Sequence, residues 1–199
     1  MRVLDLFCGM GGWSIGFHRE GFECVGVDIV DVGYPYEFIQ KDVRDYHPVA
    51  GEFDAIVESP PCNEFTKLRL ANKKTPPNPE KGLELVREGK RVIEEANPKY
   101  WAIENVQGAL KHFYPLLGSP SLISPPWYVW GRFPRFLMPS SNRFEKAAHL
   151  SYDGRKKGNK GSWLNDPGRH NPMRSWIRAR IPLPLSLALA RACKESLTV

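Results

Sequence analysis

One cysteine in this chain stands in a setting that could support covalent chemistry. Cys62 follows two prolines in the stretch ESPPCNEFT (58–66), directly after the apolar run DAIV (54–57). A cysteine thiolate is a nucleophile, and proline restricts the backbone that carries it. A free cysteine at the end of a strand can equally be a small buried apolar side chain. The stretch alone therefore leaves both interpretations open.

A glycine-rich turn near the N-terminus is a second candidate site. FCGMGG (7–12) separates an apolar stretch from an amphipathic one, and glycine lets a ligand approach the backbone closely. Asp28 follows about twenty residues later, where a carboxylate accepts hydrogen bonds from ribose hydroxyls. Together they indicate an adenosine-type ligand, and the spacing GxGG, without GxGxxG, favours S-adenosylmethionine over a dinucleotide. An ordinary tight turn beside a surface aspartate is the alternative.

The surrounding elements predict a doubly wound, mostly parallel α/β sheet. Short strands and longer amphipathic helices alternate, with the strands expected at 2–7, 24–29, near Ile39, 53–59 and 100–105, and the helices at 13–22 and 80–98. Ligands of such sheets bind at the carboxyl ends of the strands. The candidate reactive groups all fall at such ends: Gly9, Asp28, Asp42, Cys62 and Glu104.

The chain divides into three expected parts. Residues 1–125 are predicted to form the catalytic, cofactor-binding core, and 126–180 a small basic segment that recognises nucleic acid. Beyond about residue 107 the sequence is rich in proline and basic residues, and little periodicity is visible there. Residues 181–199 begin with a proline-started apolar stretch, which predicts a helix that returns to the core.

Positive charge is concentrated in the second part. The formal net charge is +6, and residues 130–180 hold twelve Lys or Arg against three acids. Tyr152, Trp163 and Trp176 lie among these charges, as expected for a surface that contacts phosphates and stacks on bases. A solvated loop surface is the alternative.

The other cysteines do not suggest a metal site or disulfides. Cys8, Cys24 and Cys193 are far from Cys62 and from one another, without a CxxC pair, so reduced thiols and no metal are expected. Cys8 and Cys24 are interpreted as small buried apolar residues. Without a run of about 18 apolar residues or a signal-like start, the chain is expected to be cytoplasmic and to have no membrane partner.

In their order, these motifs resemble the DNA cytosine-5 methyltransferase family. The matching motifs are DLFCGMGG (5–12), Asp28-Ile29, Asp42-Val43, PPC (60–62) and ENV (104–106). The resemblance covers about residues 1–110, and it resumes at 181–193. It implies a class I S-adenosylmethionine-dependent methyltransferase fold with a small basic appendage, and DNA with a flipped cytosine as substrate.

The resemblance also implies a role for each matched residue. Cys62 would add to carbon 6 of cytosine, Glu104 would act at ring nitrogen 3, and Asn105 would orient the surrounding loops. The implied contacts to S-adenosylmethionine come from Asp5, Phe7, Gly9, Gly11, Gly12, Asp28, Ile29, Asp42, Val43 and Pro60.

Beyond residue 110 the chain departs from the family pattern. The usual arginine-rich QxRxR strand is missing, and Arg132 and Arg135 are the nearest candidates for substrate contacts. No asparagine precedes Ile181-Pro182, where the family holds the amino acid end of the cofactor. Because the recognition segment is short, the enzyme either reads few bases or obtains specificity from a separate partner.

Three other functions are compatible with parts of the pattern. RNA could replace DNA as the substrate, since a basic aromatic surface suits both. A catalytically inactive nucleic-acid-binding relative would keep the fold, although it would have little reason to keep both Cys62 and Glu104. An amino-methyltransferase acting on adenine N6 or cytosine N4 would use [DNS]PP[YFW], but Cys62 stands where its stacking aromatic ring belongs.

Overall fold

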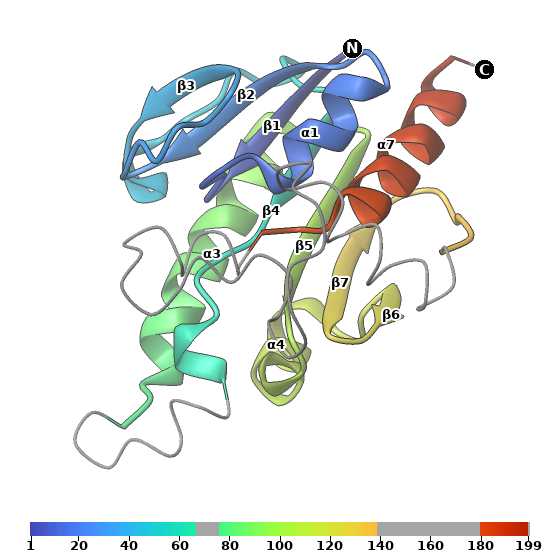
Figure 1. The fold of residues 1–199 in the computed structure, drawn as a ribbon. Helices are drawn as coiled ribbons and strands as arrows, with labels where there is room; N and C mark the ends of the chain where they lie inside the picture. Colours follow the sequence, from blue (N-terminus) through green and yellow to red (C-terminus); the bar gives the residue numbers. More distant parts are fainter. Residues whose placement is uncertain (67–75, 139–179, 199) are drawn as a thin grey trace, which may run out of the picture.

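One seven-stranded sheet organises the described residues, 1–66, 76–138 and 180–198 of the computed structural model (Figure 1). Its order is β3-β2-β1-β4-β5-β7-β6. The strands are β1 (Arg2–Leu6), β2 (Glu23–Asp28), β3 (Glu37–Gln40), β4 (Ala55–Glu58), β5 (Tyr100–Val106), β6 (Leu122–Ser124) and β7 (Trp127–Arg132). Strands β1 to β5 pair in parallel, whereas β7 runs antiparallel to both β5 and β6. The predicted doubly wound, mostly parallel sheet of the class I methyltransferase type is confirmed.

Helices cover both faces of the sheet. Helices α1 (Gly12–Arg19) and α7 (Leu183–Leu197) lie on one face, and α3 (Pro79–Ala96) and α4 (Leu110–Leu117) lie on the other (Figure 1). Strand residues alternate between the two apolar clusters, so that Val3 packs with α1 and α7 while Leu4 packs with α3. A central parallel strand is therefore apolar on both sides, as its sequence indicates.

The C-terminal helix docks on α1 through a glycine. A Cβ on Gly16 would lie 2.5 Å from the backbone carbonyl carbon of Ser186, so only glycine permits this approach. The Ser186 hydroxyl accepts a hydrogen bond from Gly16 N at 3.1 Å and donates to the carbonyl of Trp13. Helix α7 therefore packs on the sheet face that α1 covers.

Helix α3 has its expected ends. The Asn78 side chain accepts a hydrogen bond from Lys81 N at 3.3 Å, and Pro79 occupies the first turn. Asn97 ends the helix in the left-handed conformation with φ 48°, directly before Pro98. Because of these signals, α3 begins and ends within a few residues of the bounds that the sequence predicts.

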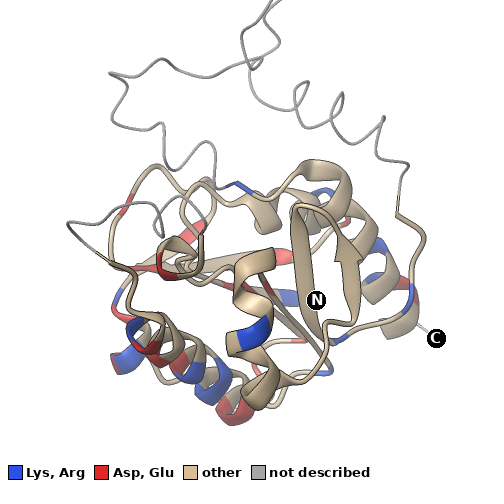
Figure 2. Ribbon diagram, turned by 90° about the horizontal axis from the view of Figure 1, so that it is seen from below, with Lys and Arg blue, Asp and Glu red and all other residues tan. Residues whose placement is uncertain are grey.

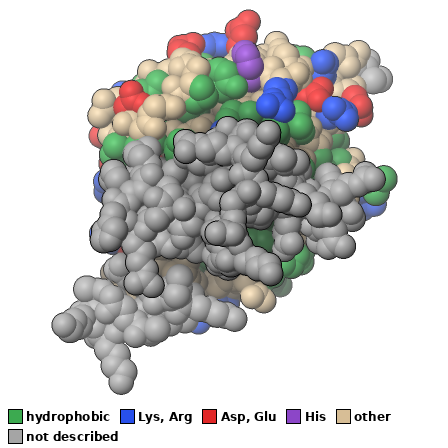
Figure 3. Space-filling model, in the orientation of Figure 1, with side chains coloured by type: hydrophobic (Ala, Val, Ile, Leu, Met, Phe, Trp, Pro, Cys, Tyr) green, Lys and Arg blue, Asp and Glu red, His purple; other side chains and the backbone are tan. Residues whose placement is uncertain are grey.

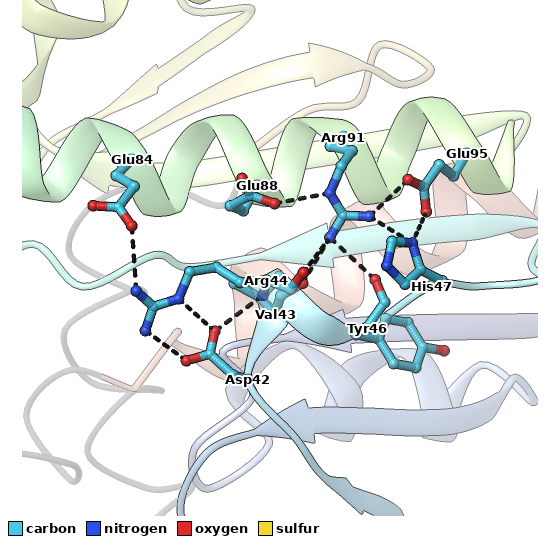
Figure 4. Close-up of polar contacts among 9 residues, drawn as sticks. All are labelled: Asp42, Val43, Arg44, Tyr46, His47, Glu84, Glu88, Arg91 and Glu95. Atoms are coloured by element: carbon cyan, nitrogen blue, oxygen red, sulfur yellow. Dashed lines mark hydrogen bonds and ion pairs between the residues drawn. The ribbon is translucent and has the colours of Figure 1, made fainter.

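Arg91 joins α3 to the segment that follows β3. Its guanidinium donates to the carbonyl oxygens of Val43 at 2.8 Å and Tyr46 at 3.1 Å, next to the 3₁₀ helix η1 (Val43–Asp45) (Figure 4). On α3 itself it pairs with Glu88 at 2.8 Å and Glu95 at 2.7 Å. Because the guanidinium also donates to two backbone carbonyls of a separate segment, Arg91 does more than a surface ion pair.

We expect Arg91→Ala to lower the free energy of unfolding by about 1–3 kcal/mol, the usual effect of losing several charge-assisted hydrogen bonds. The matched control is Arg87→Ala on the same helix, because Arg87 pairs with Glu80 on the exposed surface. That change should cost about 0.5 kcal/mol or less. Urea unfolding of the two variants measures the difference, and equal losses would contradict the anchoring role.

Three elements lie where no regular structure is predicted: α4, β6 and β7. Helix α4 is eight residues long and contains Pro115, which hides its periodicity. Strand β7 lies in the same sheet as β5, so the sheet continues past residue 125, where the core was expected to end. Phe133, Phe136 and Met138 then pack on the α1–α7 side of the sheet. The rest of the expected recognition segment, 139–179, lies outside the described residues.

Candidate active site

The carboxyl ends of β1, β2, β4 and β5 carry most of the predicted site residues. These strands are parallel, so their carboxyl ends meet at one edge of the sheet (Figure 1). The glycine turn follows β1, Asp28 ends β2, Cys62 follows β4, and Glu104 and Asn105 lie in the last part of β5. The structure thus brings the predicted ligand turn and the predicted reactive residues to a common edge.

The turn between β1 and α1 uses backbone conformations that favour glycine. Gly9 and Gly11 have φ values of 48° and 72°, and Phe7 adopts φ 55° despite its side chain. A Cβ on Gly11 would lie 3.1 Å from Cδ of Pro35, because the loop between β2 and β3 packs on the turn. The backbone of the turn is therefore tightly determined by its own glycines and by that loop.

Asp28 fixes this turn and is followed by an exposed apolar side chain. Its Oδ2 accepts a hydrogen bond from Gly9 N at 3.0 Å, and its Oδ1 accepts one from Val30 N at 3.3 Å. A carboxylate has further lone pairs available for hydroxyl donors. Ile29, the next residue, is 60% exposed. An acceptor beside an accessible apolar surface suits the ribose and base of an adenosine.

Asp5 is buried beneath the turn and bonds to the first turn of α1. It is 1% exposed, and its Oδ2 accepts hydrogen bonds from the Ser14 hydroxyl at 2.6 Å and from Ser14 N at 3.3 Å. The Ser14 hydroxyl also shares a 2.6 Å hydrogen bond with the Tyr34 hydroxyl. Burial raises the pKa of the Asp5 carboxyl to about 8, although the bonds from Ser14 oppose that shift. All these contacts are to protein groups, so Asp5 positions α1.

The acid after β3 is engaged by a neighbouring arginine. Arg44 donates to both oxygens of Asp42, at 3.0 Å and 2.7 Å, and reaches Glu84 on α3 at 3.2 Å (Figure 4). These hydrogen bonds lower the pKa of the Asp42 carboxyl. Val43, the second predicted contact here, is buried in the core cluster beneath α3. The structure therefore gives both residues protein partners.

The loop after β4 holds Cys62 half-buried. Pro60 is buried, and the 3₁₀ helix η2 (Asn63–Phe65) begins directly after the cysteine, with Phe65 N donating to the Cys62 carbonyl at 2.9 Å. The buried Phe65 ring lies edge-on to Phe113 of α4, at 5.2 Å between centroids. Burial, and then the charge of Glu104, raise the pKa of the Cys62 thiol above its usual value. The two predicted reactive groups are therefore electrostatic neighbours.

Glu104 lies in the buried part of the same edge. It is 8% exposed, and burial raises the pKa of its carboxyl to about 7, against the effect of a hydrogen bond from Ser59. A carboxyl with this pKa exists in both protonation states near neutral pH, which suits a proton donor. Ser59 was not among the predicted site residues, although it belongs to the SPPC stretch.

Asn105 ties the two motif segments together. Its Nδ2 donates to the carbonyl of Pro60 at 3.0 Å, and its Oδ1 accepts a hydrogen bond from Val106 N at 2.9 Å. Just beyond it, a Cβ on Gly108 would lie 1.9 Å from the carbonyl oxygen of Phe65, so the ENVQG and CNEF segments touch backbone to backbone. These contacts hold the loop after β4 against the end of β5.

Glu58 is a buried acid that was not among the predicted site residues. It ends β4 on the α3 side, has 0% exposure, and neither carboxyl oxygen has a hydrogen-bond partner among the described residues. Burial raises the pKa of this carboxyl well above its usual value. Space for it exists because position 89 of α3 is glycine: a Cβ there would lie 1.8 Å from Oε2 of Glu58.

The two predicted substrate-binding arginines lie away from this edge. Arg132 is level with Trp101 at the amino end of β5, and its guanidinium donates to the carbonyls of Lys99 and Pro98 at 3.1 Å and 2.6 Å. Arg135 is exposed in the irregular segment after β7. The structure therefore does not bring Arg132 together with Cys62 and Glu104, because β7 runs antiparallel to β5.

Charges on the described surface are mixed. Acidic and basic residues are interspersed along α3 (Figure 2), and both signs also occur on the described part of the face in Figure 3. Of the twelve basic residues counted between 130 and 180, only Arg132, Arg135 and Arg180 lie within the described residues. The predicted nucleic-acid surface therefore falls largely outside the part of the chain that the structure describes.

The other cysteines and Trp13 belong to the core. Cys8, Cys24 and Cys193 are buried free thiols, and burial raises the pKa of Cys24 and of Cys193 to about 12. Trp13 is buried between α1, α7 and the sheet. Across the described ranges, no cluster of three His, Cys, Asp or Glu could hold a metal ion. The helices seen there are too short or too polar to cross a membrane.

Comparisons with known proteins point to one family. The family described as C-5 cytosine-specific DNA methylase matches residues 1–114, more than half of the chain. A Frog virus 3 protein named "Probable DNA (cytosine-5)-methyltransferase" is 36% identical over 125 residues, which cover 57% of this chain and 58% of that protein. The type II methyltransferase M.FnuDI of Fusobacterium nucleatum is 32% identical over 119 residues, covering 55% of this chain and 33% of the relative.

The matched region is thus only part of these relatives, since it spans 58% of the viral protein and 33% of the bacterial one. Among solved structures, an Escherichia coli prophage protein described as a DNA modification methyltransferase aligns with a TM-score of 0.45 and 22% identity. That alignment covers 66% of this chain and 46% of the other.

Proposed function

Because the chain belongs to the C-5 cytosine-specific DNA methylase family, we propose that it transfers a methyl group to carbon 5 of cytosine in DNA. The observation that carries this proposal is the pairing of Cys62 with Glu104. The Asn105–Pro60 hydrogen bond joins their two segments, and the Glu104 charge raises the pKa of the Cys62 thiol. A nucleophile and a proton donor in electrostatic contact are what addition to a cytosine ring requires.

Cys62 would be the covalent nucleophile. Carbon 5 of cytosine is a weak nucleophile, and addition of a thiolate to carbon 6 breaks the 5,6 double bond to give an enamine that is reactive at carbon 5. After methylation, loss of the carbon 5 proton and breakage of the carbon–sulfur bond restore the double bond and free Cys62. The two prolines before Cys62 and the buried Phe65 after it limit the directions from which the thiol can reach a ring.

Glu104 would act at ring nitrogen 3. Negative charge develops on the ring as the thiolate adds, and a carboxyl group that donates its proton there stabilises it. With a pKa raised to about 7, Glu104 holds a proton in a large fraction of molecules near neutral pH. Once its proton is in place the carboxyl carries no charge, so it no longer opposes ionisation of Cys62. Protonation at nitrogen 3 and attack by sulfur therefore assist each other.

The turn after β1 and the end of β2 would hold the cofactor. Asp28 offers lone pairs to ribose hydroxyls and Ile29 offers an accessible apolar surface to an adenine, with Gly9 and Gly11 keeping the backbone close to the ligand. S-adenosylmethionine would supply the methyl group as an electrophile. Asp5 and Val43 would support this site from the core, and Asp42 would contribute only if Arg44 released it.

The substrate base would have to leave the duplex, because carbons 5 and 6 of a stacked cytosine are covered. The basic and aromatic composition of residues 139–179 supports a role in contacting phosphates and bases. Since this segment is short for target recognition, we also propose that a separate partner contributes sequence specificity.

Product identity tests the proposed function. The chain would be incubated with methyl-labelled S-adenosylmethionine and amplified genomic DNA, which carries no methylation, and the DNA would be digested to nucleosides for mass spectrometry. We expect label in 5-methyl-2′-deoxycytidine. Label in N4-methylcytosine or N6-methyladenine would overturn the reaction, and label in a matched RNA but not in DNA would overturn the substrate.

A further inference from the structure

Ser59 connects a buried tryptophan to Glu104. Trp13 Nε1 donates a hydrogen bond to Ser59 Oγ at 3.0 Å, and the strand register places Ser59 beside Glu104, where its hydroxyl lowers the pKa of the Glu104 carboxyl. An indole N–H can only donate, so Ser59 Oγ must accept that bond. Its single hydroxyl proton is then available for Glu104. The chain of donors therefore runs from Trp13 through Ser59 to the carboxylate.

The fold fixes all three members of this chain. Glu58 pairs with Ile103 between β4 and β5, so the next residues, Ser59 and Glu104, lie side by side on the α1–α7 face. Trp13 is 1% exposed in the core of that face, and the Ser186 hydroxyl of α7 holds its backbone carbonyl. A buried indole between two packed helices has little freedom to turn.

Such a connection matters because a carboxyl group has two equivalent oxygens and rotates about its last bond. A donor held on one oxygen fixes the plane of the group and leaves the other oxygen for a substrate. The Ser59 bond also favours the ionised carboxylate, so it limits how far burial can raise the Glu104 pKa. Neither effect needs Ser59 to touch the substrate.

We propose that Ser59 is a positioning residue for Glu104, and that Trp13 directs the Ser59 hydroxyl so that one carboxyl oxygen is held and the other is presented to the substrate base. This inference rests on the proposed function for its catalytic meaning, but the Trp13–Ser59–Glu104 connection can be measured without any methyl transfer.

The direct test is a carbon-13 NMR titration of protein labelled at the glutamate carboxyl carbons. The Glu104 signal is assigned as the one lost in Glu104→Gln. We expect Ser59→Ala to move the Glu104 titration to higher pH by roughly one unit, because a hydrogen bond to a charged group is lost. Ser59→Thr keeps the hydroxyl and should restore most of the wild-type value. Trp13→Phe removes only the directing donor, so its upward shift should be smaller.

The matched control is Ser121→Ala, which removes an exposed hydroxyl bonded to the carbonyl of Gly131 elsewhere in the same sheet. It should leave the Glu104 titration unchanged. If Ser59→Ala also leaves it unchanged, the proposal is overturned. Equal loss of the wild-type titration in Ser59→Ala and Ser59→Thr would likewise overturn it, since a general packing defect would then be the cause.

Kinetics separate this proposal from the proposed function. If the wild type transfers methyl groups, Ser59→Ala should lower kcat with little change in KM for DNA, and the fall of activity with pH that follows loss of the Glu104 proton should move with the shifted Glu104 titration. If the NMR shift occurs but the wild type methylates nothing, the positioning role stands and the proposed function fails. An unshifted pH profile in an active Ser59→Ala enzyme would overturn the positioning role alone.

Discussion

Cys62→Ser will form no denaturation-resistant adduct with DNA that contains 5-fluorocytosine, whereas the wild-type chain will form one in the presence of S-adenosylmethionine. Fluorine at carbon 5 cannot leave as a cation, so the final elimination is blocked and the protein stays attached through sulfur. A serine hydroxyl in the same place ionises far less readily than a thiol, so it is a much weaker nucleophile. Gel analysis of labelled DNA after denaturation measures the adduct.

Two variants control this experiment. Cys193→Ala removes a buried thiol on α7 and should leave adduct formation intact. Glu104→Gln keeps the nucleophile but loses the proton donor, so the adduct should form about 10²–10⁴-fold more slowly. An adduct that persists in Cys62→Ser would assign the covalent role to another residue and overturn the mechanism.

The positions of the main site residues follow from local signals in the sequence. Each motif stands where an apolar strand stops, and parallel strands bring such ends to one edge. This is why the sequence alone predicts that Asp28, Cys62 and Glu104 lie at one edge of the sheet. The returning C-terminal helix was also predictable, because a proline-started apolar stretch has to bury its face somewhere.

Contacts between distant side chains could not be predicted in this way. Nothing local to Asp42 says that Arg44 will occupy both of its oxygens, nor that β7 will carry Arg132 to the far end of β5. A signal for β7 did exist: WYVW (127–130) is a short apolar run typical of a strand buried on both faces. The neighbouring prolines and basic residues obscured it.

The packing of the Glu58 carboxyl against Gly89 is the clearest example of a contact that local sequence signals do not predict. From the sequence, Glu58 is only an acid at the end of an apolar run. In the structure its side chain points away from Ser59 and Glu104, because successive residues of a strand face opposite sides. A glycine thirty-one positions later leaves the space that the carboxyl fills. Only the packing of α3 on β4 shows that this acid has no hydrogen-bond partner within the described part of the chain.

This acid should make the protein less stable as pH rises. A carboxyl whose pKa is raised in the folded state binds its proton more tightly there than in the unfolded chain. Its contribution to stability is therefore complete below the unfolded pKa, about 4.3, and is lost at about 1.4 kcal/mol per pH unit above it until the folded pKa is reached. Asp5 and Glu104 act in the same direction, since burial also raises the pKa of each.

Glu58→Gln isolates the contribution of this one group, because the amide keeps the shape of the protonated acid but does not titrate. The variant and the wild type should have similar free energies of unfolding at pH 5, and the variant should become progressively more stable than the wild type as the pH rises toward 8. Urea unfolding at each pH measures the gap. Glu94→Gln, at a 63% exposed side chain on α3, should show no such growth. Parallel curves for Glu58→Gln and wild type would mean that the carboxyl finds a partner or solvent, and that Gly89 does not enclose a neutral acid.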